Sequence, residues 1–364
     1  MKKTIQGTLL ALLIVLCFNL CSCGNSNKLY LLNWDEYMDE DLLAEFESLY
    51  NCEIVYDVAL SNETMYSKIA SNAAPYDLVF PSDYMISQMK EENLLSSIDF
   101  TKLENYRYSN FDSTLTGLID RDCADIKDYF VPYFWGSLGI MYNTNKVSKE
   151  LVEENSWRVL FDKELTSGLK VGMYASARDS IASALLFKGF GLNTRKTAEL
   201  DAAKDVLLNM NYTKWETDAL KSDVADGKLD IALVYSGDYF DMVYSAYETS
   251  EDAQLSFDCY TPHDKNNVFF DAIVIPTTSK NTELAYKFID FMINHDNALR
   301  NAQYVGYCPT LTSVYNAMLE DEDYKNITNL DPYYPGDIIN GEIYQYLGAD
   351  IYRYYDDIYR QVKK

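Results

Sequence analysis

The sequence is poor in the residues that most enzymes use for catalysis or metal binding. Its 364 residues include only two histidines, His263 and His295, and neither has a metal-ligand partner at helical spacing. It contains no H-E-x-x-H, G-x-S-x-G or Walker motif. These absences favour a binding protein over an enzyme, and we expect neither a cofactor nor a metal.

Basic residues are also scarce. The chain has 31 Lys and Arg against 56 Asp and Glu, which gives a formal net charge of −25. Nucleic acid requires a basic surface, so we exclude it as a partner. An acidic cleft concentrates cations, so the excess of acid is compatible with a cationic ligand, although acidity can also serve solubility alone.

The N-terminus has the features of an export signal. Lys2 and Lys3 precede the apolar run "TLLALLIVLCFNL", which is too short to span a bilayer, and no second apolar span follows. "LCSC" then resembles a lipobox, with Cys23 as the residue to be lipidated. We expect a signal peptide over 1–22, a lipidated tether over 23–26, and a mature protein anchored by lipid to a cell membrane, on its outer face or in the periplasm.

Four cysteines remain in the body of the chain, and they are widely scattered without a C-x-x-C motif. They are Cys52, Cys123, Cys259 and Cys308. Export permits disulfides, and four cysteines allow three pairings among which a sequence cannot choose. Buried free thiols are the alternative.

Short apolar runs alternate with amphipathic segments along the chain. The expected strands lie within 29–32, 52–60, 76–81, 129–143, 169–174, 229–237, 255–262 and 268–276. The expected helices lie within 40–50, 197–211, 282–295 and 349–362. This order predicts an α/β fold with mostly parallel sheets, and the lack of polar alternation in the strands indicates sheets covered on both faces.

Several expected strands have aromatic and acidic residues at their ends. "LYLLNWDEY" ends in two acids between two rings, and "YDLVFPSDY", "ALVYSGDYF" and "VFFDAIVIP" show similar combinations. In open α/β sheets, ligands bind outside the carboxyl ends of strands. We therefore expect these ends to converge on a box of rings and carboxylates suited to an organic cation.

Six segments in this order carry a resemblance to a known family: "LYLLNWDEY", "SNETMYSKI", "YDLVFPSDY", "VPYFWGSLGIMYN", "VFFDAIVIP" and "VGYCPT". Together they resemble the periplasmic spermidine/putrescine-binding proteins of ABC importers, from about Lys28 to the C-terminus. The resemblance implies a two-lobe periplasmic-binding-protein fold with the ligand in a cleft between the lobes. Lobe one would be 27–133 plus 257–306, and lobe two 134–256 plus 307–364.

The resemblance also implies a function and partners. The ligand would be a linear polyamine, putrescine or spermidine, and the partners would be the permease subunits of an ABC importer in the membrane. The protein would act as a monomer. A receptor for another organic cation, a sensor or adhesin that retained the fold, and a hydrolase of unrecognised type are the alternatives. A zwitterionic ligand would need an arginine for its carboxylate, and Arg178 is the only arginine in the segments of the expected site.

The residues that match the family's ligand contacts come from both expected lobes. They are Trp34, Asp35, Glu36, Tyr37, Ser82, Tyr84, Asp179, Thr217, Tyr235, Asp238, Phe269, Asp271, Tyr307 and Gln345. At the last position, Tyr344 is an alternative to Gln345.

Some of these positions depart from the family's pattern. Asp35 stands where relatives often have a small hydroxyl residue, and Tyr235 replaces a tryptophan. Ser176 replaces the second acid of spermidine-type relatives, whereas putrescine-type relatives carry an acid at the position of Asp238. These last two residues favour the shorter diamine.

Carboxylates and rings suit a polyamine because its charged nitrogens are separated by apolar methylenes. Charge-assisted hydrogen bonds hold the nitrogens, and ring faces cover the methylenes. Each residue also has a purely structural interpretation: Asp179 could complete a capping box with Ser176, Trp34 could be a half-buried anchor, and Tyr235 or Phe269 could be core. Asp271 is hard to explain as core, because ionised side chains are almost never buried unpaired.

Overall fold

The computed structural model describes residues 27–249 and 254–363 of the chain. The expected signal peptide, the tether over 23–26 and the expected lipidation site at Cys23 lie outside the described residues. Within the described ranges, no helix is both long and apolar enough to cross a membrane.

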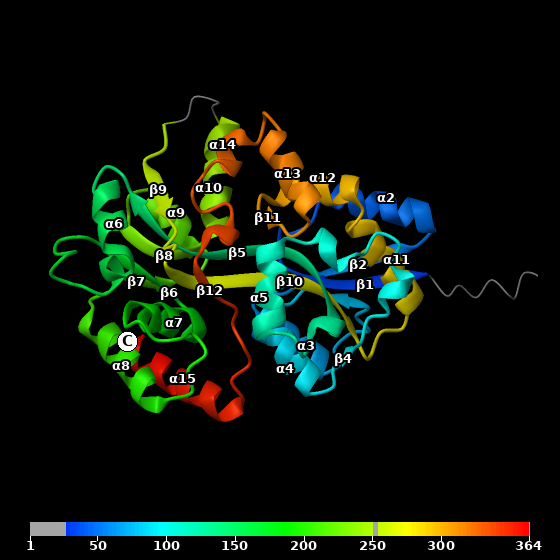
Figure 1. Cartoon of the computed structure of the whole chain (residues 1–364), viewed down its shortest axis with the longest axis horizontal. Helices are drawn as coiled ribbons and strands as arrows, with labels where there is room; N and C mark the ends of the chain where they lie inside the picture. Colours follow the sequence, from blue (N-terminus) through cyan, green and yellow to red (C-terminus); the bar gives the residue numbers. More distant parts are fainter. Residues whose placement is uncertain (1–26, 250–253, 364) are drawn as a thin grey trace, which may run out of the picture.

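The strands join into one connected sheet with the order β2-β1-β3-β10-β5-β8-β6-β7 along its main path. Figure 1 shows the two longest strands, β5 and β10, running side by side through the middle of the molecule. The strands are β1 Lys28–Asn33, β2 Glu53–Val58, β3 Leu78–Val79, β4 Leu95–Ser96, β5 Phe130–Asn143, β6 Val171–Tyr174, β7 Lys214–Glu216, β8 Ile231–Tyr235, β9 Phe257–Tyr260, β10 Lys265–Pro276, β11 Cys308–Pro309 and β12 Asn340–Glu342.

The sheet has two parallel parts joined by antiparallel pairs. β2, β1 and β3 run parallel in the first half, and β8, β6 and β7 run parallel in the second half. β10 pairs antiparallel with β3 and β5, and β5 pairs antiparallel with β8 and β9. The two long strands therefore belong to both halves.

Helices cover the sheet on both sides (Figure 1). They are α2 Glu40–Tyr50, α3 Asn62–Ala70, α4 Asp83–Glu91, α5 Ser113–Asp122, α6 Lys149–Asn155, α7 Ala177–Phe187, α8 Thr197–Asn209, α9 Ala219–Ala225, α10 Ser236–Thr249, α11 Thr282–Met292, α12 His295–Val305, α13 Thr312–Glu320, α14 Lys325–Thr328 and α15 Ala349–Val362. Short 3-10 helices span Phe100–Lys102, Tyr108–Asn110, Lys127–Tyr129, Ser156–Leu160 and Pro335–Asp337. The helix expected at the C-terminus is α15, which packs against α7 and α8.

β1 shows why the apolar strands lack polar alternation. Leu31 and Leu32 are both fully buried, but Leu31 packs in one apolar cluster and Leu32 in another, on opposite faces of the sheet. Neighbouring residues of a strand point to opposite faces, so a strand covered on both faces must be apolar throughout.

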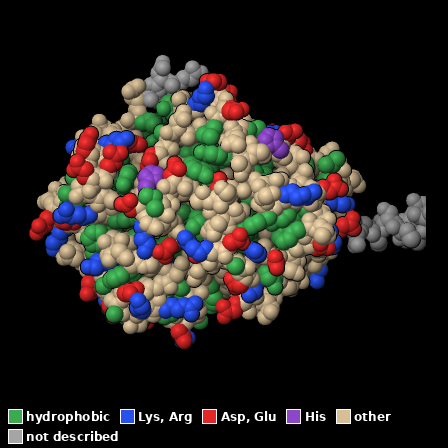
Figure 2. Space-filling model, in the orientation of Figure 1, with side chains coloured by type: hydrophobic (Ala, Val, Ile, Leu, Met, Phe, Trp, Pro, Cys, Tyr) green, Lys and Arg blue, Asp and Glu red, His purple; other side chains and the backbone are tan. Residues whose placement is uncertain are grey.

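The surface charge is mixed. Figure 2 shows acidic and basic side chains interspersed over the visible face, so the net charge is not gathered there in one acidic patch. The four cysteines of the body are free thiols, and Cys52 alone among them is not buried.

Candidate functional site

The turn after β1 presents one ring inward and two acids outward. Asn33 Oδ1 accepts the Trp34 N–H at 2.8 Å, and Glu36 adopts a left-handed backbone conformation with φ 49°. Asp35 and Glu36 are exposed, whereas Tyr37 is buried and its hydroxyl donates to Asp271 Oδ2 at 2.8 Å. Trp34 is half-buried, and its indole N–H has no hydrogen bond to any described residue.

Asp271 lies at an irregularity of β10. The register between β10 and β5 shifts between Asp271 and Ala272, and Asp271 forms an isolated bridge with Ser82. Such a shift re-aims a side chain. The Asp271 carboxylate accepts from Ser82 Oγ at 2.6 Å and from the Tyr37 hydroxyl. Burial raises the pKa of Asp271 to about 6, although these two hydrogen bonds lower it.

The Ser82 side chain hydrogen-bonds to Asp271 instead of capping its own helix. It occupies the N-cap position of α4 but makes no side-chain capping hydrogen bond. Its hydroxyl donates to Asp271 and accepts from Asn62 Nδ2 at 3.0 Å, while its N–H donates to Asn62 Oδ1 at 3.0 Å. A serine at this position usually caps the helix, so its use here indicates a constraint imposed by Asp271.

Asp83, next to Ser82, is a second buried acid near Asp271. It is fully buried, and its oxygens accept the N–H of Tyr84 at 2.6 Å and of Phe270 at 3.4 Å. Burial raises the pKa of Asp83 well above its usual value. Asp83 thus fixes β10 through a hydrogen bond to the backbone of Phe270, the residue before Asp271.

Asp179 lies in the first turn of α7. Ser176 caps this helix, because its Oγ accepts the Asp179 N–H at 3.3 Å. The Asp179 carboxylate also has a role beyond the cap, since its Oδ1 accepts from the hydroxyls of Tyr235 at 2.7 Å and Tyr344 at 3.1 Å. Burial raises the pKa of Asp179, while hydrogen bonds to Ser176 and the two tyrosines lower it.

A file of four rings connects Asp179 with Asp271. The centroid of Tyr235 lies 5.1 Å from that of Phe269, Phe269 lies 6.3 Å from Tyr307, and Tyr307 lies 5.4 Å from Tyr37, all in edge-to-face geometry. We call Tyr235, Phe269, Tyr307 and Tyr37 the ring file. Because Tyr235 donates to Asp179 and Tyr37 to Asp271, the file ends in a carboxylate on each side.

The segment after β12 delivers Tyr344, and not Gln345, to Asp179. Arg178 lies over the Tyr344 ring at 4.4 Å and donates to Asn193 Oδ1 at 2.6 Å. The same oxygen accepts the Gln345 N–H at 2.9 Å, which fixes the segment. The Gln345 side chain donates to the carbonyl of Asp122. Arg178 is itself buried, and its Nε and Nη1 lack partners among the described residues.

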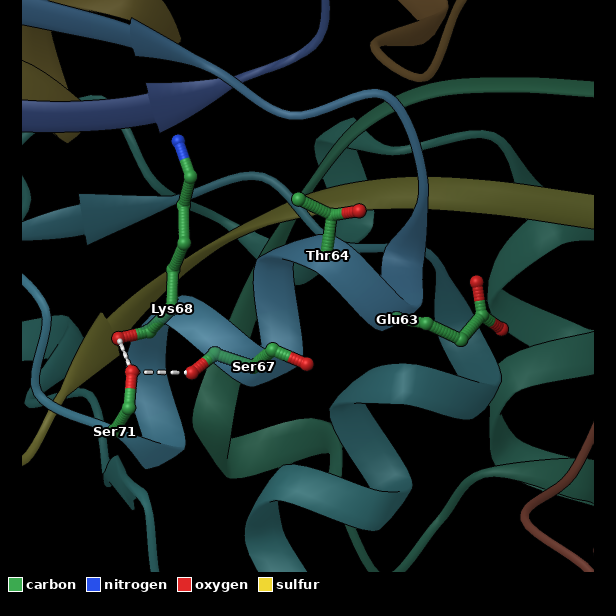
Figure 3. Close-up of a pocket in the computed structure, with 5 residues that line it drawn as sticks. All are labelled: Glu63, Thr64, Ser67, Lys68 and Ser71. Carbon is green, nitrogen blue, oxygen red and sulfur yellow. Dashed lines mark hydrogen bonds between the residues drawn. The ribbon is translucent and has the colours of Figure 1, made fainter.

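Tyr84 joins the two halves of the molecule. Its ring stacks on Tyr352 of α15 with centroids 6.4 Å apart, and its hydroxyl donates to Glu63 Oε1 at 3.1 Å. Glu63 also borders a hollow of about 350 Å³ along α3 (Figure 3). Lys68, the cation of that hollow, is already paired with Asp57 at 2.7 Å.

Asp238 lies in the first turn of α10 and is already paired with a cation. Its Oδ2 accepts the Tyr235 N–H at 2.9 Å, and its Oδ1 lies 3.7 Å from Lys221 Nζ. Burial raises the pKa of Asp238 to about 6, and the charge of Lys221 lowers it.

The structure brings most of the expected site residues together. Those joined by contacts around the ring file are Tyr37, Ser82, Asp179, Tyr235, Asp238, Phe269, Asp271 and Tyr307, with Tyr84 attached through an edge contact to Tyr344. Asp35, Glu36 and Thr217 are exposed, and ligand contact by them and by Trp34 and Gln345 stays a prediction.

The list of expected ligand contacts did not include Glu63, Asp83 and Lys221, although Asp83 lies in one of the strand ends expected to form the box of rings and carboxylates. Asp83 could have been included, because it directly follows the expected contact Ser82. The sequence offered no such indication for Glu63 and Lys221, which lie in ordinary amphipathic helices. Within 27–249 and 254–363, no group of three or more His, Cys, Asp or Glu side chains is placed to hold a metal ion.

Comparisons with known proteins agree with this architecture. The family model described as bacterial extracellular solute-binding protein matches residues 41–331. The spermidine/putrescine-binding periplasmic protein of Escherichia coli K12 is 29% identical over 368 residues, covering 100% of this chain and 99% of that protein.

Solved structures give the same result. A putative spermidine/putrescine ABC transporter from Listeria monocytogenes is 34% identical, with a TM-score of 0.76, over 93% of this chain and 99% of that one. The Tp0655 (TpPotD) lipoprotein of Treponema pallidum is 27% identical, with a TM-score of 0.77, over 92% and 99%. The α/β two-lobe periplasmic-binding-protein fold that the sequence predicted is thereby confirmed.

Proposed function

Since the chain belongs to the family of bacterial extracellular solute-binding proteins, we propose that it is an extracytoplasmic receptor that binds putrescine or spermidine and delivers it to an ABC importer. The observation that carries this proposal is the ring file with a carboxylate at each end. Asp179 and Asp271 are buried and accept hydrogen bonds from hydroxyls. The names of the relatives from Escherichia coli and Listeria monocytogenes support the same ligand class.

The physical chemistry of the site suits a linear diamine. Each ammonium group would donate to one of the two acids, joining or replacing the hydroxyl donors, in charge-assisted hydrogen bonds. The rings between the acids would cover the methylenes, and a good cation–π contact is worth roughly 0.5–2 kcal/mol. Burying an unpaired carboxylate costs free energy. A ligand that pairs with both buried carboxylates therefore lowers the free-energy cost of closing the lobes around them.

The proposal includes a hinge between two lobes. We propose the lobes 27–133 plus 257–306 and 134–256 plus 307–364 with one change: β9 Phe257–Tyr260 belongs to lobe two, so that the chain crosses between the lobes within β5 and β10. The pairing of β9 with Ile140–Asn143, at the same end of β5 as β8, argues for assigning that strand to lobe two. Ligand would favour the closed lobes through its higher affinity for them, and the permease would bind that form.

We further propose that the receptor acts as a monomer without catalytic activity, held at the membrane by a lipid on Cys23. The solute-binding family supports the first part of this statement. The lipobox sequence "LCSC" supports the anchor. Mass spectrometry of the protein extracted from membranes tests it: a diacylated N-terminal cysteine is expected, and an unmodified chain would contradict it.

Calorimetry tests the function. A chain that begins after Cys23 is titrated with putrescine, spermidine, spermine and lysine. We expect saturable binding of at least one polyamine and none of lysine, whose carboxylate would meet the acids of the site. Binding of lysine in preference to all three amines would favour a receptor for another cation, and no binding of any of them would overturn the proposal.

A further inference from the structure

We propose that Asp122, at the end of α5 in lobe one, is a positioning residue that holds the acid Asp179 of lobe two in place through Tyr344. The inference rests on the proposed function and concerns how the site is kept ready for its ligand. Asp122 is not among the residues that the sequence assigned to ligand contact. The link is the segment 341–345, which we call the strap; it begins within β12 and runs past α5 towards α15 (Figure 1).

The strap packs closely against β10 and α5 at its start. A Cβ atom at Gly341 would lie 2.7 Å from the Val268 side chain of β10 and 3.7 Å from that of Leu118 of α5. β12 pairs with β10, and Glu342 forms an ion pair with Lys265 at 3.0 Å. The start of the strap therefore cannot shift without disturbing these two elements.

Two side chains at the end of α5 bind the strap from lobe one. Asp122 Oδ2 accepts the N–H of Ile343 at 3.3 Å, and the two Asp122 oxygens accept from the Arg121 guanidinium group at 2.7 and 2.5 Å. Arg121 Nη2 donates to the carbonyl of Gly341 at 2.6 Å. Asp122, whose side chain is 13% exposed, therefore binds the strap and also orients the arginine that binds it.

The side chain of Asn193 binds the same part of the strap from lobe two. Its Nδ2 donates to the carbonyl of Ile343 at 2.8 Å, and its Oδ1 accepts the N–H of Gln345 at 2.9 Å. Ile343 is thus held by Asp122 through its N–H and by Asn193 through its carbonyl. The backbone on both sides of Tyr344 is fixed by these contacts, so the direction of the Tyr344 side chain depends on both lobes.

Tyr344 transmits the position of the strap to Asp179. It is buried, and its hydroxyl donates to Asp179 Oδ1 at 3.1 Å. The Tyr235 hydroxyl donates to the same oxygen, so the two hydroxyls orient the carboxylate and leave Oδ2 to other donors, such as an ammonium group. Within the described part of the chain, the Asp122 side chain hydrogen-bonds to its neighbour in α5 and to the strap, and not to the ring file. Asp122 therefore acts on the ligand only through the strap.

The inference predicts the effect of removing the Asp122 carboxylate. Asp122→Ala leaves the Ile343 N–H without its acceptor and Tyr344 less firmly placed, so putrescine and spermidine should bind about fivefold more weakly, as expected for one neutral hydrogen bond. Asp122→Asn keeps an oxygen that can accept this N–H and should lose less than about twofold. Asp120→Ala is the matched control, because Asp120 is an acid of the same helix, pairs with Lys127 at 3.2 Å and has a side chain that is 50% exposed.

A double-mutant cycle with Tyr344→Phe separates positioning from a general loss of structure. Tyr344→Phe removes the hydroxyl that Asp122 places and should itself weaken binding about fivefold. In that background Asp122→Ala should change the affinity less than about twofold, whereas a general loss of structure would weaken binding equally in both backgrounds. Arg121→Met, which removes the donor to Gly341, replaces Asp122→Ala under the same criteria if that variant fails to fold, as judged by thermal unfolding.

Calorimetry with putrescine and spermidine on all variants, with the wild type measured first, decides between the outcomes. A wild type that binds neither amine overturns the proposed function together with this inference. If the wild type binds, the inference alone is overturned by an unchanged affinity of Asp122→Ala, by an equal loss in Asp120→Ala or Asp122→Asn, or by a loss that persists in the Tyr344→Phe background. A loss in Asp122→Ala that is absent from Asp120→Ala and disappears in the Tyr344→Phe background supports it.

Discussion

At the scale of single residues, the environment of each acid decides what it can do. Asp271 and Asp350 have the same side chain, but Asp271 is 6% exposed beside Ser82 and Tyr37, whereas the Asp350 side chain is 92% exposed. Burial disfavours the charged form of an acid unless a cation compensates it. Only the buried acid therefore gains much from an ammonium ligand.

Replacing Asp271 by Asn should weaken the binding of every polyamine by about 1.5–3 kcal/mol, the value of a hydrogen bond to a charged group. The amide keeps the shape of the side chain but is uncharged, so it cannot form an ion pair with an ammonium group. Titration calorimetry with putrescine and spermidine measures the loss. Asp350→Asn removes the same formal charge from an exposed position and should change the affinity little, and an equal loss in both variants would contradict the assigned role.

The raised pKa of Asp271 predicts a pH dependence of binding. In the free protein this acid takes up a proton near pH 6, above its usual value of 3.8. An ammonium ligand requires the ionised form, so affinity should be constant well above pH 6 and fall as the pH drops through 6, by roughly tenfold per unit for one group. Asp238, with a pKa of about 6, is a second group titrating in this range.

The raised pKa of Asp271 lowers the affinity for an ammonium ligand as the pH falls, but it raises the stability of the free protein in the same direction. The folded state binds more protons than the unfolded state between pH 3.8 and about 6, so this contribution to stability is present below that window and is lost as the pH rises through it.

Calorimetric titrations from pH 8 to pH 5 check the pH dependence of binding, and Asp271→Asn should flatten the profile. A wild-type affinity that rises towards pH 5 would contradict the assignment.

At the scale of elements, α15 shows how a periodic sequence pattern places a functional segment. Tyr355, Ile358 and Val362 recur at helical spacing and are buried, as the sequence predicted, while Ile351 is half-buried. The helix packs on α7 and α8. It thereby fixes the chain that precedes it, which carries Tyr344 to Asp179.

Ile358→Ala should lower the free energy of unfolding by about 2–5 kcal/mol, because it leaves a cavity at a residue that is 1% exposed. Denaturation in urea measures the change. Asp357→Ala, on the neighbouring exposed position of α15, should stay within about 0.5 kcal/mol of the wild type. A small effect of Ile358→Ala would mean that α15 is not docked as the structure has it.

The sequence could not predict several local details of these elements. It left Tyr344 and Gln345 as alternatives for the ligand contact; in the structure the Tyr344 hydroxyl donates to Asp179, whereas the Gln345 side chain donates to the carbonyl of Asp122. It predicted Asp35, Glu36 and Tyr37 alike as ligand contacts, whereas in the structure Tyr37 is buried and Asp35 and Glu36 are exposed. Such choices depend on packing against distant segments.

At the scale of the whole molecule, the site depends on segments that are far apart in the chain. Tyr37 and Asp271 are 234 residues apart in sequence, and Tyr344 and Asp179 are 165 apart. Each of these contacts lies within one proposed lobe, whereas the ring file crosses between the lobes, because Tyr235 and Tyr307 of one contact Phe269 and Tyr37 of the other. A ligand that contacts both halves should therefore stabilise the whole fold.

Putrescine or spermidine at a hundred times its Kd should raise the free energy of unfolding by about 2.7 kcal/mol, because it binds the folded chain and not the unfolded one. Thermal unfolding with and without ligand measures this shift. Sodium chloride at equal ionic strength is the control for screening. A stabilisation that salt reproduces in full would contradict specific binding.

Local residue patterns predicted eight of the strands, four of the helices, the two-sided burial of the strands and the acids that are unusual in apolar surroundings, because these follow from local periodicity and from the cost of burying charge. The remaining features became apparent from the folded chain: which acids share the ring file, which of them already has a cation, and how the shift in β10 aims Asp271. These features arise from contacts between distant segments, whose geometry depends on how strands and helices pack and not on any local pattern of residues.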